Sequence, residues 1–180
     1  MCSCATEAAQ AVPLTIRAET PEDADAIAQL TEAAFLDAPH SGHTEAFIVA
    51  ALRRAGQLTI SLVAHEQATT LLGHIAFSPV SVSDGSGGWY GLGPVSVQPS
   101  RQREGIGTAL MEAGLAALRA RGAAGCVVLG DPAYYGRFGF APRPELVLPG
   151  VPPEYFQALA FDGGQPAGQV AYHEAFAATA

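Results

Sequence analysis

The junction at residues 95–110 restricts the fold most, because a strand pattern gives way there to a helix pattern across a short loop. A strand is predicted up to Val97, and an apolar stripe at helical spacing begins after Gly105 and is closed by Gly122. Gly105 and Gly107 let the backbone approach a ligand closely, and first-turn N–H groups together with the helix dipole form an anion site. The alternative is a plain strand-to-helix connection whose glycines serve only the turn.

Arginine side chains add positive charge at this junction. Six of the nine basic residues, all of them arginine, fall between positions 101 and 143, against three acidic residues there. The whole chain has 180 residues, a net charge of −8 and no lysine. A Walker A loop and a Schiff-base lysine are therefore excluded, and an acidic chain is a poor general nucleic-acid binder. The locally basic segment instead suits a phosphorylated small molecule.

The remaining pattern predicts one α/β domain over residues 13–180, after a flexible tail at residues 1–12. The turn at residues 83–88 (SDGSGG) predicts an antiparallel hairpin of its flanking strands. Residues 141–168 are rich in proline and glycine. Strands are expected near residues 14–17, 58–64, 71–82, 89–97, 126–129 and 170–176, and helices near residues 20–35, 44–55, 105–121 and 134–138.

Membrane, disulfide and metal roles are not expected from the sequence. No apolar stretch approaches the roughly 18 residues of a bilayer span, and the N-terminus lacks the features of a secretory signal, so we expect a cytoplasmic protein. Cys2 and Cys4 fall in the tail, and Cys126 lies in an apolar run where burial is expected. No further Cys/His pair stands at zinc spacing, so no metal is expected.

A second motif follows the next predicted strand. Residues 131–140 read DPAYYGRFGF, with Tyr135 four residues before a Gly-Phe pair. Leu110 stands where a Rossmann fingerprint requires its third glycine, so that fingerprint fails. With Gln102-Arg103-Glu104-Gly105-Ile106-Gly107 about 25 residues upstream, the chain from about residue 14 to 176 resembles the GNAT superfamily of N-acetyltransferases.

The resemblance implies a mixed, mostly antiparallel central sheet flanked by helices, with a V-shaped splay between the two central strands after Val97. It also implies direct transfer of acetyl from acetyl-CoA to a primary amine of a small molecule or peptide, without a metal. The acidic charge elsewhere in the chain favours a cationic acceptor, such as a polyamine, an aminoglycoside or a basic peptide terminus. A homodimer contact through the last strand stays open.

The resemblance also assigns roles to individual residues. Backbone groups of Val95 and Val97 would pair with the pantetheine arm as an added strand does. Tyr135 matches the tyrosine that protonates the departing CoA thiolate; the alternative is an aromatic that packs beside Tyr134. The residues implied to hold the pyrophosphate are Gln102, Arg103, Gly105, Ile106, Gly107 and Thr108.

The sequence departs from the superfamily pattern at three places, one of which is the approach to the second motif, where Gly130-Asp131-Pro132 stands in place of a common Asn. Glu104 stands in the phosphate loop, where it would repel phosphate unless it points away. The glutamate base that often precedes the Val97 position is absent, since residues 92–94 are Leu-Gly-Pro. Glu45, His40 and His43 are weak substitutes, each of which is otherwise a solvated polar residue, and an amine that arrives neutral needs no dedicated base.

Other polar residues have structural interpretations, and two further functions stay open. His74 is expected to be a core or sheet-face histidine, and Asp131 to cap the short helix. The first alternative function is a non-catalytic acyl-CoA-binding or regulatory module of the same fold. The second is a nucleotide-binding protein of another fold.

Overall fold

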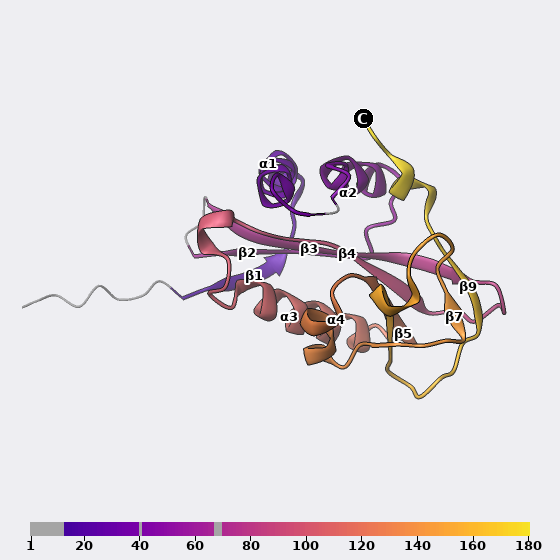
Figure 1. Ribbon diagram of the computed structural model, residues 1–180. Helices are drawn as coiled ribbons and strands as arrows, with labels where there is room; N and C mark the ends of the chain where they lie inside the picture. Colours follow the sequence, from indigo (N-terminus) through magenta and orange to yellow (C-terminus); the bar gives the residue numbers. More distant parts are fainter. Residues whose placement is uncertain (1–12, 40, 67–69) are drawn as a thin grey trace, which may run out of the picture.

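A computed structural model describes residues 13–39, 41–66 and 70–180 (Figure 1). The expected tail at residues 1–12, with Cys2 and Cys4, lies outside the described residues, as does His40. The helices are α1 (Ala24–Phe35), α2 (Glu45–Arg54), α3 (Ile106–Ala120) and α4 (Pro132–Tyr135). The strands are β1 (Thr15–Ala18), β2 (Ile60–His65), β3 (Leu71–Val82), β4 (Trp89–Val97), β5 (Gly125–Leu129), β6 (Ala141–Pro142), β7 (Leu146–Val147), β8 (Phe156–Ala160) and β9 (Gly168–Tyr172).

The strands form a mixed sheet in the order β1-β2-β3-β4-β5-β8-β6, and β9 pairs with β3 and β7. The hairpin of β3 and β4 is antiparallel, as its turn predicts. Among the strands that the structure describes, only the β4–β5 and β7–β9 pairs are parallel. The predicted mixed, mostly antiparallel sheet flanked by helices is therefore confirmed.

The splay between β4 and β5 begins earlier than the sequence predicts. The two strands pair only as far as Leu92 opposite Val128, while β4 continues to Val97. Along β3, the register shifts between Ile75 and Phe77, so that β4 carries an extra residue at this point. Pro94, which has no N–H to donate, lies in the bulge. The prediction of a splay after Val97 is thus wrong in its position, because the bulge separates β4 from β5 at Leu92.

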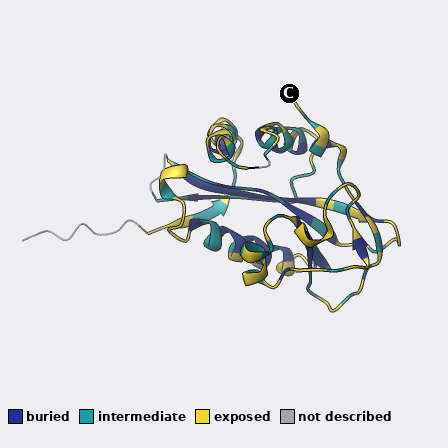
Figure 2. Cartoon of the chain, viewed as in Figure 1, coloured by how far each residue is buried: buried dark blue, intermediate teal, exposed yellow. Residues whose placement is uncertain are grey.

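Helices cover both faces of the sheet: α1 and α2 lie on one face, and α3 and α4 on the other (Figure 1). Burial follows this layering, with the buried residues in the strands and on the helix faces turned toward them (Figure 2). Leu110 and Leu118 of α3 are fully buried against the sheet, in the same cluster as Phe77 of β3. Cys126 is a buried free thiol, as expected. The core therefore holds the start of α3 rigidly at the end of β4.

The C-terminal third departs most from the expected elements. Residues 141–168 contain β8, which pairs antiparallel with β5. Its sequence, FQALA, has no β-branched residue and only one aromatic, so local preference gives little sign of a strand. The last strand ends at Tyr172 rather than near residue 176, because the chain then turns into a short helix, η5 (Glu174–Ala177). The His173 Nδ1 atom caps this helix by accepting a hydrogen bond from the Ala175 N–H at 3.1 Å.

Candidate active site

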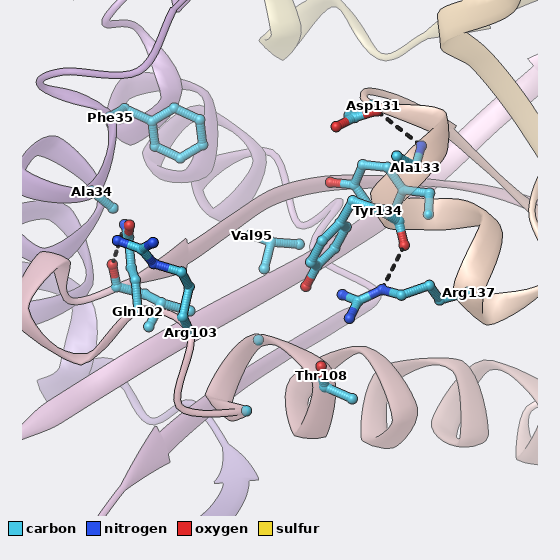
Figure 3. A pocket seen from close by; sticks show the side chains of 14 residues that line it. Ala34, Phe35, Val95, Gln102, Arg103, Thr108, Asp131, Ala133, Tyr134 and Arg137 are labelled. Carbon is cyan, nitrogen blue, oxygen red and sulfur yellow. Dashed lines mark hydrogen bonds between the residues drawn. The ribbon is translucent and has the colours of Figure 1, made fainter.

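A cavity of about 820 Å³ opens where β4 leaves β5 (Figure 3). Its wall is built by the end of α1, the end of β4, the loop into α3 and the segment around α4. The predicted site residues that it brings together are Val95, Val97, Gln102, Arg103, Gly105, Gly107, Thr108 and Tyr135. Ile106 is different, because its side chain is buried in the core beneath α3 and only its backbone belongs to the helix start.

The start of α3 presents unpaired amides to this cavity. Gly105 caps the helix in the left-handed conformation, with φ at 90°, which favours glycine. The Ala109 N–H donates to the Gly105 carbonyl at 2.9 Å, so the N–H groups from Gly105 to Thr108 have no partner within the helix. These amides lie at the positive end of a helix of 15 residues, which makes the site suitable for an anion.

Two arginines at the cavity add positive charge, while the nearest loop acid is held aside. Arg103 and Arg137 line the cavity. Glu104 does not line it, because its Oε2 atom accepts a hydrogen bond at 2.7 Å from Arg101, which also forms a bidentate pair with Glu66. The repulsion expected from Glu104 is thereby reduced, since its carboxylate is paired away from the cavity.

The free edge of β4 forms the floor between the two motifs. Val95 and Val97 face Ile75 and Gly73 across the β3–β4 ladder. Beyond Leu92, the other edge of β4 has no strand partner among the residues that the structure describes. The Gln102 side-chain amide donates to the Val97 carbonyl at 3.3 Å. An extended ligand can therefore add to this edge at Val95, as a strand would.

Two adjacent tyrosines form the wall opposite α3. Asp131 accepts a hydrogen bond from the Ala133 N–H at 2.9 Å and caps α4, as predicted. Tyr134 points its hydroxyl toward the start of α3 (Figure 3), where a Cβ at position 107 would lie 2.9 Å from it. The Tyr135 ring meets Tyr134 edge-on at 4.9 Å between centroids, and burial raises the pKa of Tyr135, so its hydroxyl stays protonated at neutral pH.

A second cavity, of about 370 Å³, meets the first. Phe35, Val95 and Tyr135 line both cavities, so these side chains separate them. Of the weak base candidates that the structure describes, Glu45 lines the second cavity and His43 lines neither. Leu148 brings the proline-rich segment to the wall of this cavity.

Sequence reasoning missed most of the second cavity. Tyr172 and Phe176 line it from the end of the chain, and Phe35 from the end of α1. Nothing local marks these residues, because they meet only when β9 pairs with β3 and the chain then returns beside α2 (Figure 1). Sequence reasoning also treats Tyr134 only as a neighbour of Tyr135. The pair of tyrosines is itself a signal, because successive residues on a helix point in different directions and so present their side chains to different parts of a site.

Metal sites and membrane-spanning helices are absent from the described ranges. No group of three or more His, Cys, Asp or Glu side chains is arranged to hold a metal ion in the part of the chain that the structure describes. None of the helices described here is long and apolar enough to cross a membrane.

Known proteins are similar to this chain in sequence and in the arrangement of their elements. A family model described as an acetyltransferase (GNAT) domain matches residues 15–143. An uncharacterised N-acetyltransferase of Escherichia coli (strain K12), YhbS, is 39% identical over 127 residues, which cover 71% of this chain and 73% of YhbS.

Solved structures agree with these matches. The crystal structure of a GNAT family acetyltransferase from Brucella melitensis in complex with acetyl-CoA has a TM-score of 0.81 at 53% identity, covering 92% of this chain and 99% of the other. The structure of E. coli YhbS in complex with CoA has a TM-score of 0.84 at 36% identity, covering 93% of each chain. The alternative of a nucleotide-binding protein with another fold is therefore wrong.

Proposed function

The chain belongs to the GNAT acetyltransferase family, and on this premise we propose that it transfers acetyl from acetyl-CoA to a primary amine by direct attack. The observation that carries this proposal is the cavity that connects the unpaired amides of α3, the free edge of β4 and Tyr135. Its volume of about 820 Å³ lies within the range of small-molecule sites. Acetyl-CoA and CoA are bound by the Brucella and E. coli relatives, which supports the same donor here.

The donor would be held by groups of three kinds. Its diphosphate would take hydrogen bonds from the amides between Arg103 and Thr108, Ile106 contributing its backbone alone, with Arg103 and Arg137 supplying charge. Its pantetheine amides would pair with the β4 backbone at Val95 and Val97. These contacts would direct the thioester toward Tyr135, where the two cavities meet.

Between heavy atoms, the reaction forms one C–N bond and breaks one C–S bond. The neutral amine nitrogen attacks the thioester carbonyl carbon, the new C–N bond forms, and the C–S bond breaks. The leaving thiolate takes the proton of the Tyr135 hydroxyl, which is then restored from solvent, and the nitrogen loses its extra proton to water. Burial raises the pKa of Tyr135 and would raise that of a thiol beside it in the same way, so proton transfer between them is not opposed by the environment.

No metal enters this proposal, and we place the reaction in the cytoplasm. No nucleic acid or membrane partner is part of it, and a homodimer through the last strand stays open. The alternative is a non-catalytic acyl-CoA-binding module, which the missing glutamate at residues 92–94 favours. The two differ in turnover and not in donor binding.

The test compares acetyl transfer by the wild type and by Tyr135→Phe over a panel of amines. We expect kcat to fall by more than about tenfold in this variant, with the Kd for CoA unchanged, because only the proton donor is lost. Tyr155→Phe is the matched control, since Tyr155 is 45% exposed and lines neither cavity. Tight CoA binding without transfer to any amine would favour the non-catalytic module, and full activity of Tyr135→Phe would remove this role from Tyr135.

A further inference from the structure

The second cavity has a wall that is mostly apolar. Ile48, Leu92, Leu129, Leu148 and Phe176 line it, and they come from α2, β4, β5, the proline-rich segment and η5. Leu129 remains 47% exposed although it ends a central strand. At about 370 Å³, the cavity is near the lower end of the range for small-molecule sites. Its size and lining suit a small molecule with an apolar body.

Two polar side chains stand out against this lining. Glu45 is the only acidic residue among the described residues that line the cavity, and Ser41 Oγ donates to its Oε1 atom at 2.7 Å, which fixes the carboxylate at the start of α2. The buried hydroxyl of Tyr172 has no hydrogen-bond partner among the described residues. Because this hydroxyl has almost no accessible surface, the ring of Tyr172 and not its hydroxyl borders the cavity.

The position of Tyr172 depends on a neighbouring glycine. The ring packs directly against Gly91 of β4, where any side chain would collide with it. Phe176 also packs on the ring, with centroids 4.6 Å apart. These contacts fix the ring at the wall of the cavity, where it adds to the apolar lining, while its hydroxyl is enclosed by the protein.

We propose that the acceptor is a small primary amine that carries a single positive charge and an apolar body. This inference rests on the proposed function and names the substrate class of the same site. The Glu45 carboxylate attracts the ammonium group, and the apolar wall, which includes the Tyr172 ring, covers the body. The amine nitrogen, once neutral, lies toward the side chains shared with the donor cavity.

The same lining disfavours the polycationic acceptors that the net charge suggests. A polyamine or aminoglycoside would bring further ammonium groups against apolar side chains, and within the described part of the chain a single carboxylate lines the cavity to receive them. An unpaired charge in such surroundings is far more costly than an apolar group. The local lining therefore outweighs the overall acidity of the chain as a guide to the acceptor.

The first experiment measures kcat/KM with acetyl-CoA for 4-methoxyphenethylamine, hexylamine, spermidine and kanamycin. We expect the methoxy monoamine to exceed spermidine and kanamycin by at least about tenfold, a difference of about 1.4 kcal/mol. Binding of the same amines to the CoA complex is followed by ligand-observed NMR, which needs no turnover. Preference for either polycation, or no binding of the monoamines to a CoA complex that forms normally, would overturn the inference.

The second experiment tests the role of the carboxylate. Glu45→Gln should raise the KM for the methoxy monoamine by about tenfold, while the KM for acetyl-CoA stays unchanged. Glu32→Gln is the matched control, since Glu32 lines neither cavity.

The results separate this inference from the proposed function. An unchanged KM for the monoamine in Glu45→Gln would overturn the assignment of the acceptor while leaving acetyl transfer intact. Failure of the proposed function would instead appear as loss of CoA binding or as the absence of transfer to every amine. In the latter case, the NMR arm still decides whether apolar monoamines occupy the cavity.

Discussion

Gly107 lies where the first turn of α3 comes closest to the tyrosine wall. A side chain at this position would point toward the Tyr134 hydroxyl, 2.9 Å from the Cβ, and would take up space in the cavity beside the unpaired amides. The backbone of Gly107 itself is ordinary helix, so the requirement for glycine is one of space and not of conformation. This allows a substitution that tests donor binding with little effect on the backbone.

Gly107→Val should weaken CoA binding by at least about tenfold, because its branched side chain fills the approach of the diphosphate to the helix start. The measurement is isothermal titration calorimetry with CoA. Gly87→Val is the control, since Gly87 lies in the β3–β4 turn with nothing within 4 Å of its Cβ position. An unchanged Kd in Gly107→Val would count heavily against the donor site proposed here.

Some site residues are predictable from sequence because their signal is local. Gly105 and Gly107 lie within a few residues of each other, and Tyr135 stands at a fixed spacing from Gly139, so both motifs are visible without the fold. Phe35 and Tyr172 have no such signal, since their place at the cavities depends on pairing between distant strands. The residues of the proposed donor side are therefore largely predictable from sequence, whereas those of the proposed acceptor side are largely not.

At the scale of elements, a polar cluster joins β1, α2, β2 and β3. Glu19, directly after β1, accepts two hydrogen bonds from Arg53 at 2.8 and 2.9 Å and one from the Ser61 hydroxyl. Because that hydroxyl donates to Glu19, the His74 Nε2–H donates to Ser61 Oγ, at 2.8 Å. His74 is fully buried, as the prediction of a core histidine requires, and burial lowers its pKa so that it stays neutral.

This cluster makes stability depend on pH through Glu19. Burial alone would raise the pKa of Glu19, but hydrogen bonds from Arg53 and Ser61, together with the His74 Nε2–H at 3.7 Å, outweigh it and lower the pKa from 4.5 to about 2. A carboxyl whose pKa is lowered in the folded state stabilises it above the unfolded pKa, and this stabilisation is lost as the pH falls toward the folded pKa. The relevant window is therefore between about pH 5 and about pH 2.

Glu19→Gln should lower the free energy of unfolding by about 2–3 kcal/mol at neutral pH and should flatten its decrease between about pH 5 and about pH 2.5. Urea unfolding at several pH values measures both effects. Glu112→Gln, at an exposed carboxylate of α3, is the control and should change neither. The same acid dependence in Glu19→Gln as in the wild type would show that Glu19 does not contribute to it.

Elements are predictable where their own periodicity determines them. The bounds of β3 and β4 agree with the expected ranges, and α3 lies within one residue of its expected start and end, because each has a clear alternation or stripe. In contrast, β8 is a strand because β5 offers it a partner, and the splay begins at Leu92 because of a bulge against β3. Both depend on contacts between distant segments, which periodicity does not report.

At the scale of the whole molecule, a chain with a net charge of −8 presents a site for an anion. The two facts are compatible because charges are screened beyond about 10 Å at about 0.1 M salt. Arg103 lies at the cavity itself, whereas most acidic residues are distributed over the rest of the chain. We therefore expect local charge to govern the proposed donor binding at ordinary ionic strength.

The Kd for CoA should rise about three- to fivefold between about 0.1 and about 0.5 M NaCl, because salt weakens the attraction between arginine and phosphate. Arg103→Gln should flatten this dependence when it is followed by calorimetry. Arg121→Gln should not, since Arg121 is exposed at the far end of α3 and lines neither cavity. A Kd that falls with added salt would show that the overall negative charge dominates instead.

Phe35, Val95 and Tyr135 border both cavities, so a change in the size of any of these three side chains alters both compartments at once. With donor and acceptor bound as proposed, each methylene added to the acyl group projects into the room needed by the incoming nucleophile. A longer acyl group and a bulkier amine therefore compete for the same space, so that the amine that fits becomes smaller as the acyl group becomes longer.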